Sequence, residues 1–317
     1  MLKKAKLILI AALVLSGCST IENESKKDRN TETNTETKSV PEEMEASKYV
    51  GQGFQPPAEK DAIEFAKKHK DKIAKRGEQF FMDNFGLKVK ATNVVGSGDG
   101  VEVYVHCDDH DIVFNASIPF DKSIIDSDSS LRSEDKGDDM STLVGTVLSG
   151  FEYRAHKEEL DNLTEVLKEY KSKYKYTGYT ENAIMKTQNS GFRNEYYYLT
   201  AIPYTLDEYK RYFQPLIKED DKSFRYGMRN SKKQLKDKSR PYVVTTLFST
   251  KDNFTKDNFT KDNTIDEMID FSEVLKKKKN IPHDLNVSLQ ISNKYINTTR
   301  PNYSKKDVIE VGVFNHE

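Results

Sequence analysis

The 317-residue sequence predicts an α+β fold, and three observations support this class. Residues 56–86 carry apolar side chains at spacings of mostly three and four, which indicates a helix. Residues 88–118 form short apolar runs separated by polar turns, two of them with clear alternation, which indicates an antiparallel β-meander. Beyond residue 140, helical patterns and β-branched runs follow one another in mixed order, which again favours α+β.

The N-terminal half contains the clearest elements. The helix opens after Pro56 and Pro57, since proline suits a first turn, and Gly86 is a suitable stop. Three strands follow at 88–95, 101–107 and 112–118, and an acidic segment at 121–139 has the composition of a mobile loop. A long central helical region is expected from about residue 140 to 174, with a break near Gly150.

The second half is a mixed α+β region. Its expected elements are a strand at 195–202, a helical pattern at 206–235 interrupted by Pro215 and Gly227, a strand at 242–249, a helix at 265–279, and strands at 285–292 and 308–314. The repeat "TKDNFTKDNFTKDNT" at 250–264 is too short in period for a solenoid, so we expect an exposed loop. A soft boundary near residue 177 divides 48–176 from 177–317, and the two regions can equally form one continuous domain.

Composition limits the classes of partner. Hydrophobic residues make up 36% and charged residues 32% of the chain, which indicates a polar body with enough apolar surface to fold. The 50 Lys and Arg residues nearly balance the 51 Asp and Glu residues. This balance gives no electrostatic case for binding nucleic acid, so the sequence predicts no nucleic-acid partner.

The N-terminus has the pattern of an export signal. Lys3, Lys4 and Lys6 precede the apolar run "LILIAALVL", which is too short to span a bilayer but fits the central region of a secretory signal peptide. The run ends in "LSGC", Leu15 to Cys18. These four residues resemble the lipobox of bacterial lipoproteins, which reads Leu, a small residue, Gly or Ala, and an obligatory Cys.

The lipobox resemblance implies a covalent membrane anchor. Residues 1–17 would be removed by cleavage after Gly17, Cys18 would receive an S-diacylglyceryl group, and its new amino group would be acylated. Each buried methylene contributes about 0.8 kcal/mol, so two or more acyl chains hold a protein stably. Residues 18–47 contain almost no large apolar side chains, which predicts a disordered tether between the lipid and the folded part.

The stretch "VHCDDHD", Val105 to Asp111, has the composition of a metal or catalytic site. Side chains alternate along a strand, so Cys107 points into the core with Val105, while His106 points to the other face. The two cannot bind one metal without a bulge, and a buried thiol has a raised pKa. The acidic residues from Asp108 to Asp111 suit a tight turn, because Asp side chains bond nearby backbone amides.

Other motifs give no stronger site. The glycine-rich "GSGDG" at 96–100 precedes a strand, whereas nucleotide-binding loops precede a helix, so a hairpin turn is expected. Six histidines without a helical pair offer no zinc-hydrolase pattern. The sequence therefore predicts no catalytic residue, no metal ligand and no cofactor. One alternative stays open, a cell-envelope hydrolase that uses Cys107 or the carboxylates of Asp108–Asp111, the latter as a loose divalent-cation site.

Three stretches carry a resemblance to a known family, namely "SKYVGQGFQPPAEKDAIEFAKKHK", "NFGLKVKATNVVGSGDGVEVYVHCDDHDIVFNASIP" and "GDDMSTLVGTVLSGFEYR". With these, and over its whole length, the chain is similar to a family of uncharacterised staphylococcal lipoproteins, grouped only as a domain of unknown function. The resemblance implies an anchor at Cys18 and a location on the extracytoplasmic face of a Gram-positive cell membrane, and it implies no catalytic residue. We expect a non-enzymatic binding module with a protein or envelope partner.

Overall fold

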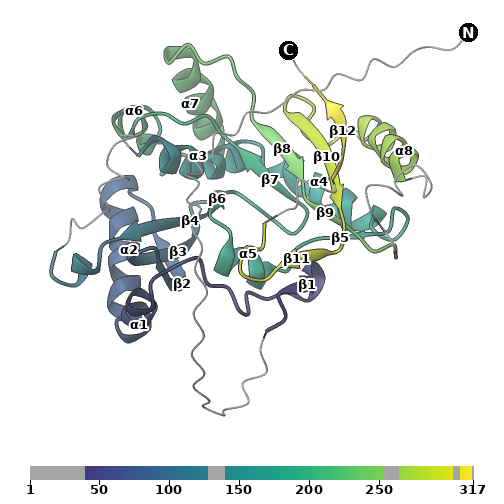
Figure 1. The fold of residues 1–317 in the computed structure, drawn as a ribbon. Coiled ribbons are helices and arrows are strands. Elements are labelled where there is room, and N and C mark those ends of the chain that lie inside the picture. The colour runs from purple at the N-terminus through teal and green to yellow at the C-terminus, as the bar shows by residue number, and fades with distance from the viewer. Residues whose placement is uncertain (1–39, 128–139, 253, 255–263, 303–307, 316–317) are drawn as a thin grey trace, which may run out of the picture. The chain divides into compact units, whose positions relative to one another are not determined.

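The computed structural model describes residues 40–127, 140–252, 254, 264–302 and 308–315. Within it, Val40–Glu317 form one compact unit. The predicted signal peptide, Cys18 and the tether as far as Ser39 lie outside the described residues, as do most of the acidic segment and most of the repeat. The α+β class is confirmed, because helices and mainly antiparallel sheets follow one another in mixed order (Figure 1).

The helix predicted over 56–86 consists of two helices. α1 (Lys60–Lys68) and α2 (Lys70–Phe85) meet at His69, whose backbone leaves the helical region with φ −113° and ψ 18°. The expected stop is confirmed, because Gly86 adopts a left-handed conformation with φ 69° and its N–H donates to the carbonyl of Met82.

The predicted meander is an antiparallel sheet with the strand order β2-β3-β4-β6. Its strands are β2 (Val89–Ser97), β3 (Gly100–Asp109), β4 (Ile112–Phe120) and the short β6 (Ser190–Gly191). His110 and Asp111 form the β3–β4 turn, both with positive φ, at 53° and 60°. The turn is thus shorter than predicted, and Asp108 and Asp109 belong to β3, because the ladder continues to the Asp109–Ile112 pair.

Helices cover both faces of this sheet. The inward side chains of β3 and β4 pack with α2 and with α3 (Ser141–Ala155) in one buried cluster that includes Phe81, Val103, Phe114 and Phe151. On the other face lies α5 (Glu181–Thr187), where the side-chain amide of Asn93 donates to the carbonyl of Lys186 at 3.1 Å. The sequence analysis did not predict α5, which is too short to show a clear helical period.

The central helical region breaks at a different place from the one predicted. α3 ends at Ala155 and α4 (Lys157–Tyr170) follows directly, with His156 at the junction in a non-helical conformation. The break expected near Gly150 was wrong. Gly150 lies inside α3 and faces β4, where a Cβ atom would lie 2.9 Å from the carbonyl oxygen of Val113. The glycine therefore permits close helix–sheet packing rather than ending the helix.

A second sheet organises the C-terminal half. Its strand order is β5 (Tyr176–Thr177), β9 (Leu247–Ser249), β10 (Asn286–Ser292), β8 (Tyr242–Thr245) and β7 (Tyr197–Thr200), and β12 (Ile309–Phe314) also pairs with β10. α8 (Thr264–Lys276) lies beside β12 (Figure 1). Leu163 of α4 and Phe271 of α8 belong to the apolar cluster that includes Val243, Leu289 and Val313 from this sheet. Two large clusters thus lie within one compact unit, and the boundary near residue 177 stays a prediction.

Three helical segments lie in the chain between β7 and β8 of the second sheet. The segment predicted as helical over 206–235 contains α6 (Leu206–Tyr212), the 3-10 helix η4 (Gln214–Leu216) and α7 (Asp221–Gln234). The interruption at Pro215 is confirmed by its place in η4. Gly227 does not interrupt α7, and a Cβ atom there would lie 2.4 Å from Cδ2 of Leu216.

Order begins earlier than the predicted tether boundary at residue 47. β1 (Glu43–Glu45) pairs with β11 (Tyr295–Asn297), and the 3-10 helix η1 (Ala46–Lys48) follows with Ala46 fully buried. Composition did not show this because the partner strand lies about 250 residues further along the chain. The remaining short helix, η2 (Lys122–Ile125), follows β4 and buries Ile124.

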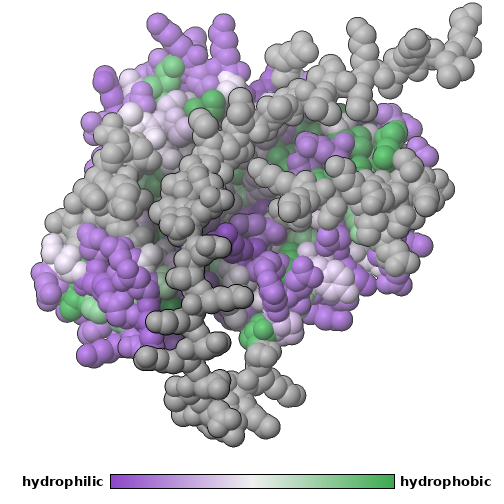
Figure 2. Space-filling model, in the orientation of Figure 1, coloured by the Kyte–Doolittle hydropathy of each residue, from purple (hydrophilic) through white to green (hydrophobic). Residues whose placement is uncertain are grey.

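The described surface is mainly polar. Figure 2 shows hydrophilic residues over most of the described surface on one face, with hydrophobic residues in small separate patches. Among the described residues, no helix combines the length and the apolar composition that crossing a membrane requires.

Close packing at Gly77 gives a test of the first core. A Cβ atom at Gly77 of α2 would lie 2.6 Å from Cγ1 of Val103. Alanine favours a helix over glycine by about 1 kcal/mol, whereas overpacking a core costs about 1–3 kcal/mol. We expect Gly77→Ala to lower the free energy of unfolding in the wild-type chain and to raise it in a Val103→Ala background. Urea denaturation of the four proteins measures both effects, and equal signs in the two backgrounds would contradict this packing.

Candidate functional site

Cys107 lies in the core, as strand alternation predicted. Its side chain is fully buried, and Sγ lies 3.5 Å from the carbonyl oxygen of Lys88. Burial raises the pKa of the Cys107 thiol to about 12, and the nearby carboxylates of Asp109 and Asp108 also favour the neutral form. His106 lies on the opposite face of β3, where Nδ1 contacts Oδ1 of Asn115 at 3.0 Å. The structure therefore does not bring these two side chains together.

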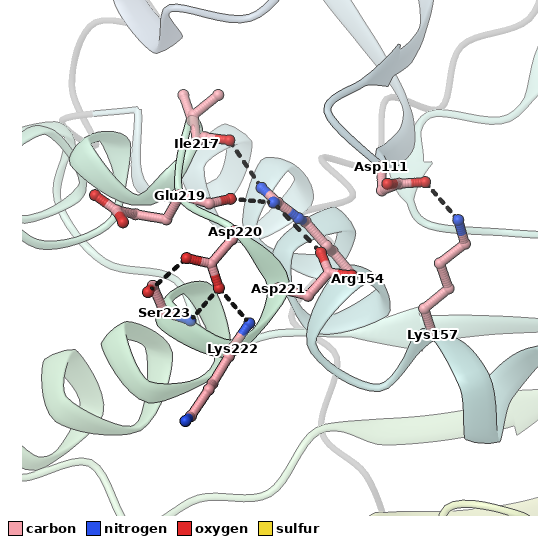
Figure 3. A network of polar contacts seen from close by, with 9 residues as sticks. All are labelled: Asp111, Arg154, Lys157, Ile217, Glu219, Asp220, Asp221, Lys222 and Ser223. Atoms are coloured by element: carbon pink, nitrogen blue, oxygen red, sulfur yellow. Dashed lines mark hydrogen bonds and ion pairs between the residues drawn. The ribbon is translucent and has the colours of Figure 1, made fainter.

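The acidic residues of the β3–β4 turn are used in local contacts. Asp109 accepts a hydrogen bond from the backbone N–H of Lys88 at 2.9 Å, and its other oxygen lies 2.8 Å from Nδ1 of His110. Asp111 pairs with Lys157 at the start of α4 (Figure 3). Asp109 and Asp111 thus fasten the turn to two different elements, and their carboxylates do not converge on one point.

A more substantial site lies between α3 and α7, in a cleft of about 360 Å³. Glu152 and His156 line it from α3 and from the α3–α4 junction, and the segments around Arg240 and Asp284 complete the lining. α7 contributes three basic side chains to the lining, namely Arg225, Arg229 and Lys232. A smaller hollow of about 160 Å³ shares Glu152, Lys232 and Arg240 with it. We call the larger hollow the α3–α7 cleft.

A buried ion pair forms the inner wall of the α3–α7 cleft. Glu152 and Lys232 lie 2.5 Å apart, with side chains 5% and 22% exposed. A buried carboxylate is strongly unfavourable without a partner, so this pair holds the two helices in a fixed register. Nearby in the smaller hollow, burial alone would raise the pKa of Asp237. Hydrogen bonds from Ser239 and Tyr204, together with the charge of Lys232, instead hold that pKa below its ordinary value.

The N-terminal end of α7 is fixed by Arg154 (Figure 3). Its guanidinium donates to the carbonyl oxygens of Ile217 at 2.8 Å and Glu219 at 2.6 Å, and it lies 4.1 Å from the ring centre of Phe224. Asp220 then caps the helix by accepting hydrogen bonds from the backbone N–H groups of residues 222 and 223. These amides hold the pKa of Asp220 below its ordinary value.

The sequence of α7 explains which way its basic side chains face. Phe224, Met228 and Ser231 are the buried positions. Arg225, Arg229 and Lys232 follow them at spacings of four and three, so they form a second stripe beside the buried one. The guanidinium groups of Arg225 and Arg229 make no hydrogen bond or ion pair with any described residue. Both guanidinium groups are therefore available to a ligand in the α3–α7 cleft.

One set of side chains in the described part of the chain could hold a metal ion. Donor atoms of His156, Glu159 and Asp284 lie within 4.8 Å of one another. Nδ1 of His156 is 3.2 Å from Glu159 and 3.9 Å from Asp284. The carboxylates are 47% and 64% exposed, respectively, and such exposed groups often meet without a metal. Two of its members, His156 and Asp284, line the α3–α7 cleft.

Sequence reasoning missed all of these residues. Two local signals were present, since Glu152 interrupts an apolar helical stripe and α7 carries its basic residues at helical spacing. Neither signal identifies the partner, because Glu152 and Lys232 are 80 positions apart and only the fold joins them.

A comparison with models of known protein families shows which family the chain belongs to. A family model described as "Protein of unknown function (DUF1672)" matches residues 36–317. The chain belongs to this family. The staphylococcal family predicted from the sequence is thereby confirmed as a domain of unknown function.

A solved structure gives the same fold. The crystal structure of a DUF1672 family protein from Staphylococcus aureus subsp. aureus Mu50 is 96% identical in sequence and superposes with a TM-score of 0.83. The match covers 88% of this chain and 100% of the crystallised chain. The search among curated proteins found no match. Neither match names a function, so a function for this DUF1672 protein has to be inferred from the contacts within the fold.

The burial of Cys107 predicts a slow thiol. In the protein without residues 1–39, Cys107 is the one cysteine that is left. We expect iodoacetamide at pH 8 to label the native protein far more slowly than the denatured protein, because the raised pKa leaves little thiolate and the core excludes the reagent. A Cys107→Ala/Asp108→Cys variant moves the thiol to an exposed neighbouring position and should react quickly while folded. Equal rates for the two native proteins would place Cys107 at the surface.

Proposed function

We propose that this DUF1672 protein is a lipid-anchored binding module on the extracytoplasmic face of a Gram-positive cell membrane. The anchor rests on the sequence "LSGC" directly after an apolar run of signal-peptide length, with Cys18 as the acylated residue. The folded unit begins at Val40, so the anchor and the cleft belong to separate parts of the chain.

The α3–α7 cleft is the observation that carries the binding role. It offers charged groups without partners in an open hollow, which is the arrangement that recognises a ligand. The alternative, a hydrolase that uses Cys107 or Asp108–Asp111, has weaker support. The thiol is buried with a raised pKa, and Asp109 and Asp111 are already bonded to other parts of the fold.

Acylation at Cys18 is the most direct test of the proposed location. Radiolabelled palmitate supplied to a Gram-positive host that expresses the full chain should label the wild-type protein. We expect no label in Cys18→Ala, because the thioether has no attachment point. Cys107→Ala is the matched control, since it removes the only other cysteine and should keep the label. Equal labelling of wild type and Cys18→Ala would contradict an anchor at Cys18.

A further inference from the structure

We propose that the α3–α7 cleft binds the phosphate group of a small organic phosphoester. This proposal deepens the proposed binding role and rests on it. Three features of the cleft support it, namely the charge of the lining, the two free arginines and the apolar side chains beside them.

The lining has a surplus of positive charge. Four cationic side chains line the cleft, namely Arg225, Arg229, Lys232 and Arg240, against the carboxylates of Glu152 and Asp284. Lys232 and Glu152 neutralise each other at 2.5 Å. Three guanidinium groups then remain against the single exposed carboxylate of Asp284. The whole chain has a formal net charge of −1, so this surplus is local to the cleft. A positive hollow concentrates anions from solution.

Arg225 and Arg229 can act on one anion together. Residues four apart on a helix are neighbours, with about 5–6 Å between their Cβ atoms. Each guanidinium presents a planar fork of N–H donors that matches a phosphate or a carboxylate. A carboxylate has two oxygens, which one fork occupies, whereas a phosphate has enough oxygens to accept from two forks at once. Two unpartnered forks side by side therefore favour phosphate.

Arg240 is a third guanidinium in the lining and is held in place by the backbone. Its guanidinium donates to the carbonyl oxygen of Asp284 at 2.8 Å, which fixes the side chain while leaving other N–H groups free. Arg240 and the α7 arginines line the same cleft from different segments of the chain. An anion in the cleft can therefore be contacted from more than one segment of the chain.

The cleft has room for more than the anionic group. Its volume of about 360 Å³ lies within the range of small-molecule sites. Ala155, Met228, Pro241 and Leu285 supply apolar contacts beside the basic side chains. These features fit a phosphoester with a short organic body better than an inorganic ion alone. The phosphate could be carried by a soluble molecule or by a lipid headgroup, and the chemistry at the arginines is the same.

Calorimetric titration tests the assignment. The protein without residues 1–39 is suitable, because Val40–Glu317 form their own unit and a 96% identical protein crystallised at 88% of this length. The probe is glycerol 3-phosphate, with glycerate as a carboxylate of similar body. We expect glycerol 3-phosphate to bind, and Arg225→Gln/Arg229→Gln to bind it at least about tenfold more weakly, since charged hydrogen bonds are lost.

The matched control is Lys222→Gln/Lys233→Gln. It removes the same charge from the same helix at exposed positions outside the cleft lining, so it should bind the probe as wild type does. Both arginines are exposed, and thermal unfolding should show equal melting temperatures for the three proteins. No binding by wild type, equal weakening in both double variants, or glycerate binding as tightly as glycerol 3-phosphate would each overturn the proposal.

Vesicles separate the two sources of phosphate. The anchor-free protein is sedimented with vesicles of phosphatidylglycerol or, as a neutral control, phosphatidylcholine. Binding to phosphatidylglycerol that is lost in Arg225→Gln/Arg229→Gln supports a lipid headgroup, and binding of the soluble probe alone supports a soluble phosphoester. Palmitate labelling of the full chain is measured separately. If the wild-type chain binds glycerol 3-phosphate but takes up no palmitate, only the anchor is contradicted. If it takes up palmitate but does not bind glycerol 3-phosphate, only the phosphate site is contradicted.

Discussion

The guanidinium of Arg154 is the contact on which the α3–α7 cleft depends. It sits near the end of α3 with its side chain only 7% exposed, and it bonds two carbonyl oxygens in the segment that leads into α7. Its Nε has no hydrogen-bond partner, and the charge is stabilised by those two bonds, by the carboxylate of Asp221 at 3.6 Å and by the ring of Phe224. With the start of α7 held there, Lys232 at the other end of the helix reaches Glu152.

The side chains of four consecutive residues near the end of α3 lie in four different environments. Phe151 belongs to the core under the meander, and Tyr153 stacks on Phe192 in the second core with ring centres 4.0 Å apart. Glu152 faces the α3–α7 cleft and Arg154 holds α7. Successive side chains on a helix point about 100° apart, so one turn can reach all four surroundings. The short segment "FEYR" therefore links both cores to the candidate site.

Sequence rules correctly predicted the features that depend on residues close together in the chain. Strand alternation placed Cys107 in the core, Gly86 ended its helix, and Pro215 interrupted the next helical region. The failures came from contacts distant in sequence. Gly150 was taken for a helix break, but its role is to let β4 approach, and nothing near it in the chain shows that. The sequence did not show the α3–α7 cleft for the same reason, since the segments that line it with the end of α3 lie about 70–130 residues further along the chain. In the "VHCDDHD" stretch, which was conspicuous by composition, Cys107 is buried and Asp109 and Asp111 contact other parts of the fold.

Amide hydrogen exchange of an Arg154→Lys variant tests the central claim most directly. Lysine keeps the charge but lacks the planar fork that reaches both carbonyl oxygens. We predict that the amides of α7 exchange at least about tenfold faster than in wild type, as expected for loss of about 1.4 kcal/mol of local stability. The amides of β3 and β4 should keep their wild-type rates. Unchanged exchange in α7, or an equal increase in α7 and in the meander, would contradict the role assigned to Arg154.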